Sequence, residues 1–132
     1  MKTLSVNATN EEIIEVVHQW VRLLEAQDYT QAIKFIEQEG DHWTPELLRE
    51  VIETYANAEP DPDQRVTFHG KPTDSIQLVE VDRWDGERSA GAVGSVWYDL
   101  NINGEISDLT ATFLVVLDPD GLRLSLEDVH VM

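Results

Sequence analysis

The hydrophobic period of this chain changes once, at a proline-rich stretch near its middle. Before residues 59–63, apolar residues recur every three or four positions, the spacing of amphipathic helices. After this stretch they alternate at every second position, and β-branched and aromatic residues become frequent, as in strands. Pro60 and Pro62 prevent a helix from continuing across it. The sequence therefore predicts an α+β layout, with helices at about residues 10–57 and a sheet at about 65–132.

We expect three helices, each beginning at a side chain that can cap its first turn: Thr9, Asp28 and Thr44. Thr9 is followed by Glu12 at the spacing of a capping box. The second helix is expected to end at Gly40, because glycine favours the backbone conformation that terminates helices. Each helix has one apolar face, so each should cover another layer.

Five strands are predicted, at residues 66–68, 75–84, 91–102, 109–117 and 122–131. Turn residues separate the longer ones, with Asn103-Gly104 as the strongest hairpin signal. Because every connection is a hairpin, the sheet is expected to be antiparallel.

The last strand contains an irregularity. Leu122, Leu124 and Leu126 share one phase, whereas Val129 and Val131 have the opposite one. This predicts a β-bulge near residues 127–128, which bends the strand. A bent sheet with three helices on its concave face encloses a cone-shaped interior, where a small apolar ligand is a candidate occupant.

Composition limits the class of protein. The 132 residues form one expected domain, and 26 acidic against 9 basic residues give a net charge of -17. This charge argues against nucleic acid and anionic membranes as partners and is compatible with a basic protein partner. The chain has no cysteine, and its four histidines lack metal-ligand spacing, so neither a metal nor another cofactor is expected. Without an apolar segment long enough for a membrane span or signal peptide, we expect a cytoplasmic protein.

Five residues are candidates to line the interior: Trp20, Tyr55, Tyr98, Asp128 and His130. On a straight last strand, Asp128 and His130 would both face the core, and a carboxylate beside an imidazole is a candidate general base. With a bulge, Val129 and Val131 face inward and His130 lies outside, and this second interpretation is favoured. We assign no catalytic residue.

The opposite phase of the strands is not uniformly polar. Its apolar members are Val93, Trp97, Leu114 and Val116. A sheet that is apolar on both faces needs a second cover. We therefore expect a homodimer formed through this outer face.

The order of elements resembles the nuclear transport factor 2-like (cystatin-like cone) superfamily, over residues 13–131. Three segments, Trp43–Leu48, Asp108–Phe113 and Glu127–Met132, are similar to a family of short uncharacterised bacterial proteins within it. The superfamily includes ketosteroid isomerases, scytalone dehydratases and polyketide cyclases, and also members that only bind or dimerise. The resemblance places a donor tyrosine of the isomerases on the first helix, but residues 10–27 contain none. No catalytic residue is carried over.

Three classes of function remain, and the sequence names no substrate for any of them. The first is a non-catalytic binding or dimerisation domain. The second is a small-molecule pocket, including an isomerase or dehydratase type. The third is an acidic, immunity-type antagonist of a basic protein.

Overall fold

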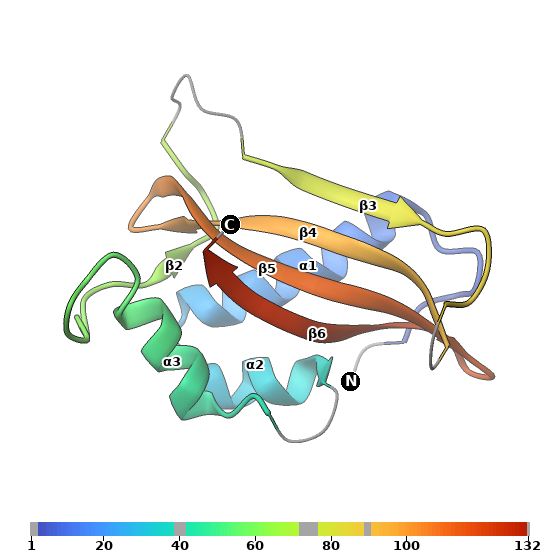
Figure 1. Ribbon diagram of the computed structural model, residues 1–132, viewed down its shortest axis with the longest axis horizontal. Helices are drawn as coiled ribbons and strands as arrows, with labels where there is room; N and C mark the ends of the chain where they lie inside the picture. The colour runs from blue at the N-terminus through green and yellow to red at the C-terminus, as the bar shows by residue number, and fades with distance from the viewer. Residues whose placement is uncertain (1–2, 39–41, 72–76, 89–90, 132) are drawn as a thin grey trace.

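The computed structural model describes residues 3–38, 42–71, 77–88 and 91–131 and has the α+β layout that the sequence predicts (Figure 1). Three helices come first: α1 (Asn10–Glu25), α2 (Tyr29–Phe35) and α3 (Pro45–Glu53). The strands are β1 (Glu37–Gln38), β2 (Val66–Thr67), β3 (Val79–Arg83), β4 (Ala92–Ile102), β5 (Glu105–Asp118) and β6 (Gly121–Val131).

The predicted caps are confirmed. The Thr9 hydroxyl accepts the Glu12 N–H at 3.2 Å, and the Glu12 carboxylate accepts the Thr9 N–H at 3.2 Å, which completes the capping box. Asp28 caps α2 by accepting the Gln31 N–H, and Thr44 caps α3 by accepting the Leu47 N–H. The end of α2 was predicted wrongly, because the helix ends at Phe35. Gly40, its expected end, lies outside the described residues.

The long strands β4, β5 and β6 form an antiparallel meander, with β2 and β3 paired to β4. The predicted strands are therefore present within the described residues, although the one expected at 75–84 is described as a strand only from Val79 to Arg83. The turn at Asn103-Gly104 is confirmed, with φ values of 51° and 81° that such a two-residue hairpin requires.

The expectation of a wholly antiparallel sheet was wrong. After α2 the chain runs beside β6, and β1 pairs with it in parallel, Glu37 with Ser125 and Gln38 with Leu126. This strand has two residues, which is too short for any alternation of apolar residues to be visible in the sequence. It partly covers the edge of β6.

All three helices lie on one side of the curved sheet. In Figure 1, α1 crosses behind β4 and β5, and α2 and α3 lie beside β6. Within the described residues, the face turned to the viewer carries no helix. The core fills the space between the layers. Trp20 of α1 meets Phe113 of β5 edge to face, with ring centroids 5.2 Å apart. Both side chains are fully buried.

The predicted bulge is present in β6. Thr112 pairs with Asp128 and Phe113 with Leu126, so Glu127 has no partner on β5. Val129 therefore turns inward and is 4 % exposed. Val131 does not follow it into the core as expected: it is 57 % exposed, since the strand ends there.

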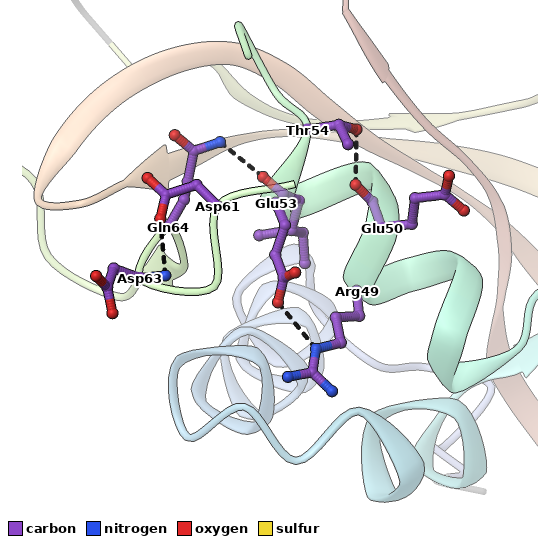
Figure 2. A network of polar contacts seen from close by, with 8 residues as sticks. Arg49, Glu50, Glu53, Thr54, Asp61, Asp63 and Gln64 are labelled. Atoms are coloured by element: carbon purple, nitrogen blue, oxygen red, sulfur yellow. Dashed lines mark hydrogen bonds and ion pairs between the residues drawn. The ribbon is translucent and has the colours of Figure 1, made fainter. Parts of the chain in front are cut away.

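The connector between the two halves is fixed by hydrogen bonds to α3 (Figure 2). The buried Gln64 side chain donates to the carbonyl oxygens of Ile52 and Tyr55, at 2.8 and 2.7 Å. The Asp61 N–H donates to the Glu53 carbonyl oxygen at 3.0 Å. These bonds add partners for carbonyl groups at and just beyond the end of α3, where the hydrogen-bond ladder of the helix stops.

Candidate functional site

The interior of the cone is occupied by side chains. Trp20, Tyr98 and Phe113 are each at most 2 % exposed, and none of them lines the clefts described below. Burial raises the pKa of the Tyr98 hydroxyl, while Gln77, which hydrogen-bonds to it, acts in the opposite direction. Trp20 and Tyr98, two of the candidate pocket residues, are therefore core residues.

Tyr55 lies away from Trp20 and Tyr98, just beyond the end of α3. Its hydroxyl donates to the Asp108 carboxylate of β5. This contact ties α3 to the sheet. Burial, followed by the hydrogen bond to Asp108, raises the pKa of Tyr55.

The bulge places Asp128 and His130 on the outer face of the sheet. His130 Nδ1 lies 3.1 Å from Asp128 Oδ2, and the two side chains are 39 % and 50 % exposed. The two residues therefore form a partly solvated pair rather than a base in a dry interior. The five candidate interior residues do not converge on one cavity.

Three of the four residues expected on the outer face are there. Trp97 and Leu114 are half-buried and Val116 is 8 % exposed, each in the phase opposite to the core. Val93 does not lie on the outer face, contrary to the prediction. The register of β4 shifts between Ala92 and Gly94, and this irregularity turns Val93 toward the core, against which it packs.

A polar network on the outer face joins β4, β5 and Leu78, which directly precedes β3. The Asp99 carboxylate accepts hydrogen bonds from Trp97 Nε1 at 3.0 Å and from the Thr110 hydroxyl at 2.8 Å. Its second oxygen accepts the Leu78 N–H at 3.2 Å. The network holds the indole of Trp97 in place, so a half-buried aromatic ring is presented on a rigid strand.

Thr112 lies at the centre of this face, directly between Trp97 and Asp128 in the strand register. It is 9 % exposed, and its hydroxyl has no hydrogen-bond partner in the described part of the chain. Nothing in the sequence singles out this residue, since a threonine in a strand is ordinary. The neighbouring hydroxyl residues Thr110 and Ser125 are also buried.

A small hollow adjoins the outer face at the β6 edge. It measures about 210 Å³ and is lined by His42, Trp43, Leu114, Ser125, Leu126 and Glu127. This volume is below the roughly 300–1,000 Å³ that is typical of small-molecule sites. The hollow therefore suits a protruding side chain better than a substrate.

Charges lie at the margins of the outer face. Glu80 and Asp82 are exposed on β3, at one edge. On β6, at the other side, Arg123 is paired with Asp118, in addition to the His130–Asp128 pair. The centre, around Thr112 and Leu114, is uncharged, as the centres of protein interfaces usually are.

His18 lies at the boundary between the buried and the exposed side of α1. Its ring meets Phe68 and Tyr98 edge to face, at 4.9 and 5.7 Å. Burial lowers the pKa of His18, and Glu15 opposes that effect.

The described residues contain no group of three or more histidine and acidic side chains placed to hold a metal ion. In the same residues no helix is long and apolar enough to cross a membrane.

The fold and the uncovered face together define an α+β domain with a filled interior and a semi-apolar outer sheet surface. The sequence profile of the Domain of unknown function (DUF7668) matches residues 21–132, and the chain belongs to this family. The match includes α2, α3 and the whole sheet. A search of curated proteins finds no match, and neither does a search of solved structures.

Proposed function

We propose that this protein is a non-catalytic binding domain that forms a homodimer through the outer face of its sheet. The observation that carries the proposal is the combination of Trp97, Leu114 and Val116 on a helix-free face with an interior already filled by Trp20 and Phe113. An apolar sheet surface of this kind needs a partner layer.

A second copy of the chain fits this face because the face carries both a protruding group and a hollow. Trp97 lies on β4 and the hollow lies at β6, on either side of β5. A two-fold axis running along β5 would lay β4 of each copy over β6 of the other. Trp97 of one copy would then approach the hollow of its partner, a self-complementary contact. The same axis brings the acidic β3 edge toward the edge that carries Arg123 and His130.

The experiment is sedimentation velocity of the full chain over a range of concentrations from about 1 to 100 µM. The wild type should sediment as a dimer, and Leu114→Lys should raise the dissociation constant at least about tenfold, because it buries an unpaired charge at the centre of the interface. Leu117→Lys is the matched control: it lies on the same strand in the other phase and is 43 % exposed. A wild type that is monomeric throughout this range overturns the proposal.

Two alternatives have weaker support. An isomerase or dehydratase-type site needs free volume beside an ionisable group, and the filled interior around Tyr98 counts against it. An acidic, immunity-type antagonist is favoured by the net charge of -17 alone. The response of binding to salt separates this class from the homodimer, as argued below.

We further propose that the domain is a distant relative of the nuclear transport factor 2-like superfamily. The support is the order of three helices followed by a bent meander, with the helices on one side. Fold alone assigns no activity.

A further inference from the structure

A polar cleft of about 510 Å³ lies where the end of α1, the connector and the β4–β5 hairpin meet. Its lining includes Gln27, Asp63, Arg65, Thr67, Asn103 and Gly104. The volume falls within the range of small-molecule sites, unlike the hollow on the outer face. The proposed dimer makes no use of this cleft.

Two opposite charges line this cleft without neutralising each other. Asp63 and Arg65 are both exposed, and neither side chain has an ion pair or hydrogen bond with the described residues. Three of the six guanidinium groups, those of Arg22, Arg49 and Arg123, are paired with a carboxylate. An unpaired guanidinium beside an unpaired carboxylate offers partners for two opposite charges on one ligand.

The backbone that carries these charges is held firmly. The Asp63 N–H donates to Asp61 Oδ1 at 2.9 Å, and Figure 2 shows the Asp63 carboxylate turned away from the α3 network. The Arg65 N–H donates to Asn103 Oδ1 at 3.1 Å, and the Asn103 N–H donates to the Arg65 carbonyl oxygen at 3.0 Å. The two charged side chains therefore extend from fixed positions, which lowers the ordering cost of binding.

Gln27 is a second feature of the cleft that points to a ligand, besides the two unpaired charges. It follows the Ala26 cap of α1 with a φ of 58°, and its N–H donates to the Leu24 carbonyl oxygen at 2.9 Å. Glycine is the usual residue at this position, because a side chain is strained there. The Gln27 side chain lines the 510 Å³ cleft and also an adjoining cleft of about 230 Å³. A strained residue whose side chain lines two clefts is a candidate for function.

We propose that the larger cleft binds a small zwitterion of the α-amino acid class. Arg65 binds the ligand carboxylate, Asp63 binds the ammonium group, and the Gln27 amide supplies neutral hydrogen bonds. A simple anion would be repelled by the net charge of -17 and would leave Asp63 unmatched, whereas a zwitterion carries no net charge.

The test is an NMR titration of the ¹⁵N-labelled full chain with the twenty standard L-amino acids, first pooled and then singly, at up to about 10 mM each. At least one amino acid should shift the backbone amides of Thr67, Asn103 and Gly104. Acetate and methylamine serve as probes that carry one charge each. If either shifts these amides as strongly as every amino acid does, the cleft holds an adventitious ion only and the proposal fails.

Substitutions at Arg65 and Asp63 then test whether these two side chains bind the charged groups of the ligand. Arg65→Gln and Asp63→Asn should each weaken binding about tenfold or more, since each removes one charge-assisted contact. Arg88→Gln is the matched control, because Arg88 packs over the Trp84 ring away from the cleft residues, and it should leave binding unchanged. Gln27→Gly should weaken binding while the melting temperature stays equal or rises.

The proposal is overturned if no amino acid shifts the three amides, or if Arg88→Gln weakens binding as much as Arg65→Gln does. A lower melting temperature of Gln27→Gly with unchanged binding would assign a structural role to Gln27. The strained backbone at this residue would then no longer support a ligand site. None of these outcomes bears on the dimer, whose test measures mass.

Discussion

At the scale of single residues, His18 of α1 links the helix layer to the sheet through its ring contact with Tyr98. Burial disfavours its charged form, and Arg22 adds to this effect, so its pKa in the folded chain lies below 6.5. The unfolded chain therefore binds the proton more readily. The stabilisation from the neutral ring is present above pH 6.5 and is lost as the pH falls below it.

We predict that His18→Gln makes the free energy of unfolding less dependent on pH. Between about pH 7.5 and 5.5, the wild type should lose more stability than the variant, because the variant has no proton to take up at this position. Urea unfolding at both pH values measures the difference. His42→Gln, an exposed histidine, is the control and should behave as the wild type does. An equal loss in all three proteins would contradict the prediction.

Phe113 is the residue on which the two layers meet. It is fully buried at the middle of β5 and contacts the ring of Trp20. We expect Phe113→Ala to lower the free energy of unfolding by about 3–5 kcal/mol, since it removes a large ring and leaves a cavity. Phe68→Ala, at a half-buried ring, should cost less. Chemical denaturation gives both values, and a smaller loss for Phe113→Ala than for Phe68→Ala would be inconsistent with the filled interior.

At the scale of elements, Gly94 permits the close approach of β3 to β4. A Cβ atom at this position would lie 2.6 Å from the Asp82 carbonyl oxygen, which is a backbone atom of β3. Because that atom belongs to the strand itself, only a shift of β3 can relieve the clash. The glycine thus determines how the outer strand attaches to the sheet.

We predict that Gly94→Ala loosens β3 without unfolding the domain. Hydrogen exchange at the amides of residues 79–83 should accelerate, while exchange in β5 and β6 stays slow, because only β4 pairs with β3. Ser95→Ala is the neighbouring control, at a position that faces away from the core. Unchanged exchange in β3 would mean that the strand accommodates the added methyl group.

At the scale of the whole molecule, charge decides how copies of the chain meet. Each chain carries a net charge of -17, so two copies repel each other over distances that salt screens. A basic partner would be attracted over the same distances. The sign of the salt dependence therefore distinguishes the homodimer from an immunity-type complex.

We predict that the dimer becomes tighter as NaCl rises from about 50 to 500 mM, since screening weakens the repulsion between the subunits. Sedimentation equilibrium at several salt concentrations measures the dissociation constant. Leu117→Lys, which adds a positive charge away from the proposed interface, should show a weaker salt dependence. A dissociation constant that increases with salt would contradict the prediction, because it would mean that attractive charge pairs at the margins outweigh the repulsion between two chains of net charge -17.

The sequence by itself determined the local structure of this protein. Caps at Thr9, Asp28 and Thr44, the turn at Asn103-Gly104 and the bulge at Glu127 depend on neighbouring residues and on phase, and both are legible in the order of amino acids. The inner face of the sheet was predicted for the same reason, because alternation assigns every second residue to the core.

Contacts between distant segments were decided only by the tertiary structure. The parallel pairing of β1 with β6 and the inward turn of Val93 depend on strands that are far apart in the chain. The candidate sites behave similarly: Thr112 and the cleft formed by Gln27, Asp63 and Arg65 have no local signature. Whether the cone is hollow depends on how side chains of α1 and β5 fill a shared volume, and no pattern along one strand encodes that volume.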